Sequence, residues 1–153
     1  MAESKKIAIL PIIGCAASVI LALVFLLPLM VTDMPKPLDD VTVNLFDYLE
    51  AFFEGAESTG LITATTIVLF LTHLVAIASA VLFGICIFTG NEKLLNIAKI
   101  IAYALAGLAI LGLILTFVMI GDFNVEAIKI GIAPILAAVV AVGTAVCAFV
   151  LKK

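Results

Sequence analysis

Four long runs of this sequence contain no Asp, Glu, Lys or Arg, and they limit the possible fold more than any other feature. The runs cover residues 7–32, 61–88, 100–121 and 130–151. About 20 apolar residues in an α-helix, each rising 1.5 Å, cross the roughly 30 Å of hydrocarbon in a bilayer. The sequence therefore predicts an all-α integral membrane protein, a four-helix bundle that forms a single membrane domain over residues 1–153.

The composition leaves little room for a water-soluble part. Of the 153 residues, 65% are hydrophobic and 12% are charged, and the mean hydropathy is +1.39, values that are not typical of soluble domains. With their polar ends included, the four helices are expected at about residues 7–32, 61–88, 94–120 and 125–151. The only extended polar segment is the loop 33–59, so no separate catalytic domain is expected.

The lysines are distributed unequally between the two sides of the predicted bundle. The two termini and the turn 90–99 hold six lysines, whereas the opposite side holds only Lys36 and Lys129. Because cytoplasmic loops carry an excess of basic residues, we expect both termini in the cytoplasm. A chain rich in Ile and Lys without any Arg indicates an AT-rich genome, and hence a prokaryotic plasma membrane.

The loop 33–59 is predicted to hold a short amphipathic helix outside the membrane. Leu45 and Leu49 fall on one side of it, Asn44 and Asp47 have the spacing of an N-terminal cap, and Gly55 suits the end. We expect this helix to pack over the ends of the other helices, with a position on the membrane surface as the alternative. Its outer acidic face consists of Asp47, Glu50, Glu54 and Glu57. Negative charge there disfavours nucleic acid as a partner.

Small residues recur at every fourth position in all four predicted helices. Lipid gives helices no hydrophobic reason to associate, so close backbone contact across small residues supplies packing energy instead. We therefore expect these ladders to face one another, and the bulky side chains to face lipid or a partner subunit. No sustained heptad is evident. The ladders are Gly14, Ser18 and Ala22; Ala76, Ala80 and Gly84; Ala98, Ala102 and Ala106; and Ala133, Ala137, Ala141 and Ala145.

His73 is the only histidine, and it lies near the middle of the second run on the same face as Ala76 and Ala80. An ionisable group at this depth can serve as a proton relay, ligand contact or gate, with Thr66 and Thr72 as candidate neighbours. A neutral histidine bonded to a threonine or carbonyl of the next helix is the structural interpretation. We prefer the structural interpretation, because no charged residue lies at comparable depth.

The sequence offers no motif for catalysis, metal binding or a cofactor. Cys15, Cys86 and Cys147 lie in predicted helices without C-x-x-C spacing, so they are expected to be apolar fillers. With one histidine and no glycine-rich phosphate loop, we expect neither an enzyme nor a cofactor or metal site. In layout the chain is similar to four-span families such as claudins, tetraspanins and MARVEL-type proteins. It lacks the cysteine and tryptophan motifs of the first two, so no function is transferred.

Two functions follow as hypotheses from these observations. The first is a non-enzymatic accessory or structural subunit of a larger membrane assembly. Its partners are membrane lipids and other membrane protein subunits, or further copies of itself. The alternative is a small channel or transporter whose pathway passes His73, Thr66 and Thr72.

Overall fold

The computed structural model describes residues 9–28, 30–32, 41–55, 60–123 and 128–151. This part of the chain is mainly helical, so the predicted all-α class is confirmed at that level. The helices are α1 (Ile9–Val24), α2 (Leu45–Phe53), α3 (Gly60–Thr89), α4 (Glu92–Phe123) and α5 (Ile132–Val150), and the strands are β1 (Met30–Thr32), β2 (Val41–Val43) and β3 (Ile128–Ile130).

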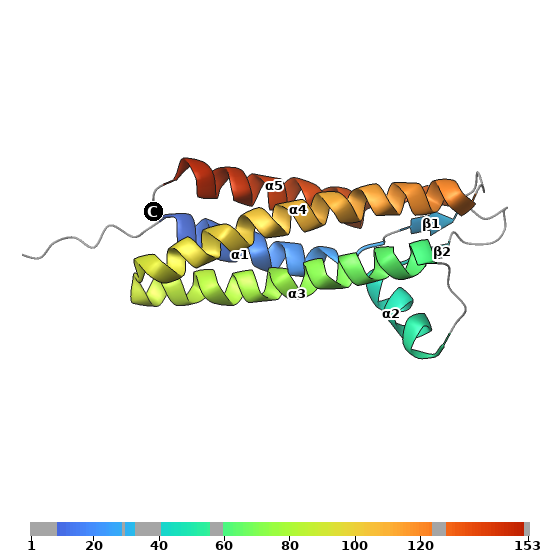
Figure 1. Cartoon of the computed structure of the whole chain (residues 1–153), viewed down its shortest axis with the longest axis horizontal. Coiled ribbons are helices and arrows are strands. Elements are labelled where there is room, and N and C mark those ends of the chain that lie inside the picture. The colour runs from blue at the N-terminus through green and yellow to red at the C-terminus, as the bar shows by residue number, and fades with distance from the viewer. Residues whose placement is uncertain (1–8, 29, 33–40, 56–59, 124–127, 152–153) are drawn as a thin grey trace, which may run out of the picture.

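Four of these helices, α1, α3, α4 and α5, lie side by side (Figure 1). α3 packs against α1 and α4, and α5 packs against the same two helices, which gives a closed arrangement of four neighbours. The start of α1, the end of α5 and the turn between α3 and α4 lie at one end, which we call the terminal end. The strands and α2 lie at the other end, which we call the sheet end.

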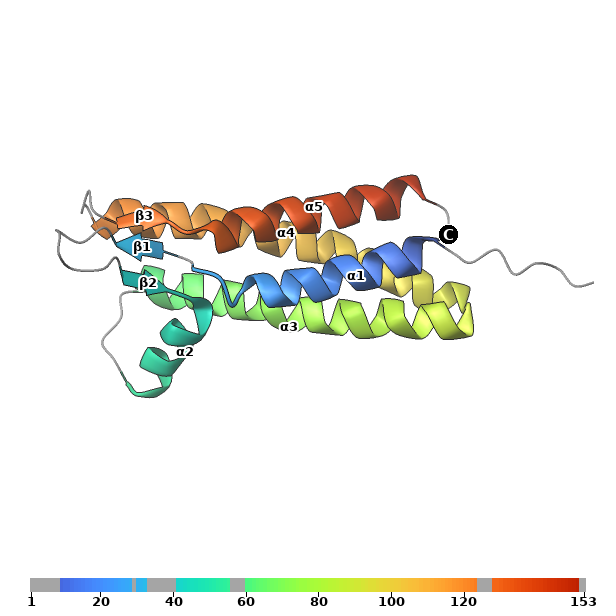
Figure 2. The ribbon, with the colours of Figure 1, turned by 180° about the vertical axis from the view of Figure 1, so that it is seen from behind.

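Three of the helices are long and apolar enough to cross a membrane. The qualifying segments are Ile62–Thr89, Glu92–Gly121 and Ile132–Val150, whereas the apolar helix Ile9–Val24 is shorter. Helices α3 and α4 contain 30 and 32 residues, so at 1.5 Å per residue they are about 45 and 48 Å long. With 16 residues, α1 extends only about 24 Å. The sheet-end parts of α3 and α4 therefore extend beyond α1, and the strands occupy the space beside them (Figure 2).

Gly90 and Asn91 predict a tight turn between the second and third runs, with Gly as the stop of one helix and Asn as the cap of the next, and this turn is confirmed. Gly90 has φ +63°, a left-handed conformation that ends a helix at little cost only for glycine. The Asn91 Oδ1 atom then accepts hydrogen bonds from the backbone N–H groups of Lys93 at 3.0 Å and Leu94 at 3.4 Å. These bonds cap α4 and make it the antiparallel neighbour of α3.

The predicted helix in the loop is also confirmed, but its packing differs from the expectation. The backbone N–H of Asn44 donates to Asp47 Oδ2 at 2.8 Å, and that of Asp47 donates to Asn44 Oδ1 at 3.0 Å. Gly55, with φ +78°, follows the helix. The apolar side chain of Leu45 is fully buried. However, α2 lies against the flank of α3 and does not cover the helix ends, because its apolar side finds an apolar surface along α3.

The strands were not expected from the sequence, and they shorten two of the predicted helices. They form an antiparallel sheet in the order β2-β1-β3, with Met30 opposite both Val43 and Ile130. The expected helix 7–32 ends at Val24, because Pro28 cannot donate a helical hydrogen bond. Instead, the Pro28 carbonyl accepts a bond from the N–H of Ala133 at 3.1 Å. This bond joins the chain after α1 to the start of α5.

The fourth helix starts later than expected, because a strand takes the place of its expected first turns. β3 precedes it, and α5 begins at Ile132 rather than near residue 125. Pro134 is therefore in the first turn, where its missing N–H has no intrahelical acceptor and the ring is tolerated. The sequence places Pro134 about one to two turns inside the expected helix and therefore predicts a kink there. This prediction is wrong, because α5 begins at Ile132.

The buried positions of the long helices alternate in steps of three and four residues. This spacing of 3.5 residues keeps a contact seam facing its partner, because it drifts only about 20° per seven residues. This seam is not evident as a heptad in the sequence, because threonine, serine, alanine and cysteine share it with larger residues. In α3 the seam is Thr65, Leu69, Thr72, Ala76, Ser79, Phe83 and Cys86; in α4 it is Leu95, Ala98, Ala102, Leu105, Ala109, Gly112, Thr116 and Met119.

Candidate functional site

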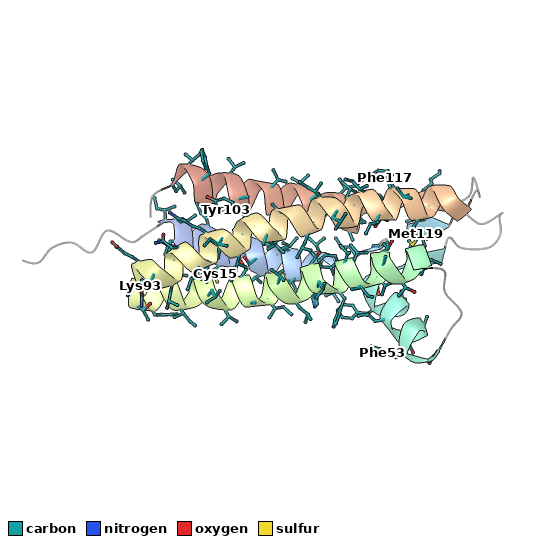
Figure 3. All side chains as sticks on the ribbon, viewed as in Figure 1. Cys15, Phe53, Lys93, Tyr103, Phe117 and Met119 are labelled. Carbon is teal, nitrogen blue, oxygen red and sulfur yellow. The ribbon has the colours of Figure 1, made fainter. Side chains whose placement is uncertain are left out.

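The outer surface of the four packed helices is made of bulky apolar side chains. Each helix contributes to it, so no helix has a polar outer face within the described residues. The exposed residues include Ile12, Val19 and Leu23 of α1, Leu74, Ile77 and Val81 of α3, Ile110, Ile114 and Phe117 of α4, and Ile135, Val139 and Val146 of α5. Figure 3 shows side chains of this kind along the whole length of the helices. This surface is the largest candidate for contacts with other molecules.

The small residues of the predicted ladders lie on the inner side of the helices. Nine are buried: Gly14, Ser18, Ala76, Ala98, Ala102, Ala106, Ala133, Ala137 and Ala141. Four are half-buried: Ala22, Ala80, Gly84 and Ala145. The half-buried residues stand late in their ladders, because steps of four residues rotate by about 40° each around a helix with 3.6 residues per turn. Residues of a ladder therefore rotate out of the contact between helices after about two steps.

Two glycines allow close contact with a large side chain of a neighbouring helix. A methyl group at Gly14 of α1 would lie 2.7 Å from ring carbons of Phe83, which is fully buried on α3. A methyl group at Gly112 of α4 would lie 2.8 Å from Leu69 Cδ2, also on α3. Both distances are too short for real carbon atoms, so the missing side chains make these contacts possible.

A hydrogen bond joins α1 to α3 in the same interior. The Ser18 and Ser79 hydroxyl oxygens are 2.8 Å apart, and the two side chains are 1% and 0% exposed. Ser18 belongs to a predicted ladder of small residues, whereas Ser79 was not predicted as a contact residue. The signal that identifies it is its position seven residues after Thr72 and three after Ala76, on the buried seam.

His73 lies where the end of α1 and the start of α2 meet α3. Its ring makes edge contacts with Phe25 (5.7 Å between centroids, 86° between planes) and with Phe46 (5.4 Å, 89°). The backbone of Ala22 is in hydrogen-bonding reach of the ring. The Nδ1 atom is buried and has no hydrogen-bond partner among the described residues. The histidine therefore occupies a largely aromatic site.

The structure does not join His73 to the two candidate threonines. Thr66 Oγ1 donates to the Ile62 carbonyl at 2.8 Å, and Thr72 Oγ1 donates to the Val68 carbonyl at 2.7 Å. Both bonds stay within α3, as is usual for threonine in an apolar helix. The three candidate residues consequently form no continuous polar network.

A groove of about 180 Å³ lies between α2 and α3, at the sheet end. The residues that line it are Leu49, Phe53, Thr66, Ile67, Phe70 and Leu71, and their exposed surface is apolar. Asp47, Glu50 and Glu54 are exposed on and next to α2, and Glu57 lies outside the described residues. The exposed acidic residues and two of the groove residues, Leu49 and Phe53, therefore lie on or next to the same short helix.

The cysteines gather toward the terminal end of the interior. Cys86 is buried in a cluster with Phe83 and Ala98, and Cys15 and Cys147 pack against it. All three are free thiols. Among the residues that the structure describes, no three His, Cys, Asp or Glu side chains are placed to hold one metal ion.

Comparison with known protein families, characterised proteins and solved structures found no match.

Proposed function

We propose that this chain spans a membrane four times and acts as a non-enzymatic accessory or structural subunit of a larger membrane assembly. The observation that carries the proposal is the exposure of bulky apolar side chains on the outer face of all four helices, while small residues lie on the inner faces together with buried Leu and Phe. A surface helix of a water-soluble domain carries polar and charged residues on its outer face. An outer face of Ile, Leu, Val and Phe on every helix suits a bundle that is surrounded by lipid or by other apolar helices.

The dimensions support the membrane placement. α5 contains 19 residues and is about 28 Å long, close to the roughly 30 Å of bilayer hydrocarbon. α1 is shorter, and the apolar turn 25–28 completes its crossing. Irregular backbone inside a membrane requires satisfied polar groups. The turn meets this requirement, because Leu26 donates to the Leu23 carbonyl at 3.0 Å and Leu27 to the Val24 carbonyl at 2.9 Å.

The charges support one orientation. Lys93 and Lys99 lie on α4 near the terminal end, whereas Asp47, Glu50 and Glu54 lie at the sheet end. The positive-inside rule then places the terminal end in the cytoplasm and the sheet, with α2, on the opposite side. α3 and α4 are longer than the hydrocarbon layer is thick. Their turns at the sheet end therefore extend into the outer headgroup region, beside the strands and α2.

The filled interior supports a structural role. Leu10, Leu21, Phe25 and Phe83 are at most 1% exposed, and they lie between the helices at successive depths. Buried threonine hydroxyls turn back to their own helices, as Thr116 does toward Gly112. A chain whose centre is packed in this way offers its outer surface for association.

The experiment is purification of the tagged chain from its native membrane in a mild detergent, after chemical crosslinking in the intact membrane. We expect a crosslinked species larger than the monomer and a fixed ratio of co-purified membrane protein, or a defined homo-oligomer. A lone monomer in both the crosslinked and the solubilised sample would contradict the proposal.

The second candidate is a small channel or transporter whose pathway passes His73. The specific observation in its favour is the buried Nδ1 atom without a hydrogen-bond partner, because an unpaired polar atom in an apolar interior is costly. The test is proton flux into liposomes that contain only this chain. Flux that disappears in the His73→Gln variant, with the helical fold retained, would favour this candidate over a structural subunit.

A further inference from the structure

We infer that the groove between α2 and α3 binds an acyl chain of a phospholipid whose head group carries an ammonium group. The inference rests on the membrane placement proposed above, with the groove in the leaflet at the sheet end. It assigns a lipid site to the chain, which the proposed structural role does not require.

The groove has the chemistry and size that a hydrocarbon chain needs. Its exposed lining is apolar and its volume is about 180 Å³, whereas an apolar cavity of about 150 Å³ is already large enough to bind benzene. Among the described residues that line the groove, Thr66 is the only one with a polar side-chain atom, and its hydroxyl donates to the Ile62 carbonyl. These lining residues therefore leave no polar side-chain atom that needs a water molecule as its hydrogen-bond partner.

The groove is open on the side where lipid would lie. Ile67 and Leu71 on α3 are 48% and 44% exposed, and Phe53 at the end of α2 is 79% exposed. Figure 3 shows Phe53 at the end of α2, away from the four packed helices. An aromatic ring exposed to this degree beside an apolar groove suits the boundary between acyl chains and head groups.

The charges beside the groove select the head group. Glu50 and Glu54 are exposed, and the backbone N–H of Glu54 donates to the Glu50 carbonyl at 2.9 Å. The helical turn thus continues to Glu54, which puts the two carboxylates on one side of α2. Each follows a groove residue, Leu49 or Phe53, by one position, which is about 100° around the helix axis, so the carboxylates flank the groove and do not line it. Neither α2 nor α3 contains a lysine, and the chain has no arginine. Negative charge without a basic neighbour on either helix attracts an ammonium and repels an anionic head group.

The experiment uses tryptophan fluorescence, because the chain has no tryptophan of its own. Phe70→Trp places the reporter in the groove. Leu111→Trp is the control at matched depth, because the neighbouring Gly112 lies against Leu69 and Leu111 is exposed on α4. Each variant is reconstituted in vesicles that contain the same small fraction of brominated phosphatidylcholine or brominated phosphatidylglycerol. Phe53→Trp, at the mouth of the groove, is a second reporter if Phe70→Trp does not fold.

We expect the reporter in the groove to be quenched at least as strongly as Trp at position 111. Quenching should be about two-fold stronger with phosphatidylcholine than with phosphatidylglycerol, as expected for an exposed ion pair, and equal at position 111. The preference should disappear in Glu50→Gln/Glu54→Gln, persist in the control Glu92→Gln at the terminal end, and weaken at high salt. Filling the groove with Ile67→Phe/Leu71→Phe should lower the quenching at position 70.

Other results would overturn the inference in distinguishable ways. Weak quenching at position 70 with strong quenching at 111 would mean that a protein segment or a second copy covers the groove, and the membrane placement would stand. Equal quenching by both lipids at position 70 would refute the role of the carboxylates. Absence of quenching at both positions would refute the lipid site and the membrane placement together.

Discussion

Ser18 of α1 and Ser79 of α3 share a hydrogen bond of 2.8 Å in a part of the interior where neither side chain is more than 1% exposed. It connects two residues that are 61 positions apart in the sequence and lie on different helices. The other short bonds from threonine side chains, such as those of Thr72 and Thr144, return to their own helices.

Removal of either serine hydroxyl should weaken the contact between α1 and α3. Ser18→Ala, Ser79→Ala and the double variant should give a coupling free energy of about 0.6 kcal/mol, the average for hydrogen bonds between membrane helices. Unfolding by SDS in mixed micelles measures it. The pair Ser18→Ala and Thr116→Ala should show no coupling, because Thr116 donates within α4. Equal coupling in both pairs would contradict a specific hydrogen bond between Ser18 and Ser79.

Gly14→Ala should destabilise the protein by about 1–3 kcal/mol, the usual range for an overpacked core. The added methyl group would lie 2.7 Å from the ring of Phe83, which is fully buried and has little freedom to move. Gly143→Ala on the outer face of α5 is the control, since no atom lies within 4 Å of its added methyl. The free energy of unfolding in mixed micelles should fall only for Gly14→Ala, and a reversed order would be inconsistent with this packing.

Asn91→Ala should cost about 1 kcal/mol, the typical value for loss of an N-cap. The Asn91 side chain accepts two backbone hydrogen bonds, from Lys93 and Leu94. Alanine has no oxygen that could accept them. Asn96→Ala, at an exposed position of the same helix, is the matched control. Thermal unfolding in detergent, followed by circular dichroism, compares the two variants, and a larger loss for Asn96→Ala would contradict the cap.

His73→Phe should destabilise the protein less than His73→Ala. Phenylalanine keeps a ring between Phe25 and Phe46 and removes the unpaired Nδ1. Alanine removes both ring contacts, each worth about 0.5–1.5 kcal/mol beyond buried area. Unfolding in mixed micelles measures both variants. Equal destabilisation by Phe and Ala would show that the imidazole makes a polar contact that the fold requires.

Local sequence signals predicted the helices and their ends where these depend on neighbouring residues. The turn at Gly90 and Asn91, and the cap formed by Asn44 and Asp47, lie where the spacing indicated. Capping requires atoms three or four residues apart, so the pattern is visible in the sequence. Apolar length is also a local property. Of the four membrane helices that it predicted, three are long and apolar enough to cross a membrane, and the first, Ile9–Val24, is shorter.

Pairing between distant residues was not visible in the sequence. Met30 pairs with Val43 and with Ile130 across the sheet, and no local pattern links positions 100 residues apart. The apolar run that continues after α1 also resembled further helix, so the early end at Val24 was missed. The site of His73 was predicted only as an inward position, because Phe25 and Phe46 reach it from segments that turn back toward α3.

By itself, the sequence determined that the chain forms long apolar helices with small residues on their inner side, because apolar length and residue size are properties of each helix alone. The tertiary structure decided where α1 stops, that a sheet and α2 flank α3 and α4, and which small residues remain on the contact seam. These outcomes depend on which helices are neighbours. Residues spaced by 3.5 positions on average stay in the contact between two helices, whereas residues spaced by four rotate away from it. Once the helix has ended before Pro28, pairing with β2 and β3 supplies hydrogen-bond partners for the backbone of β1.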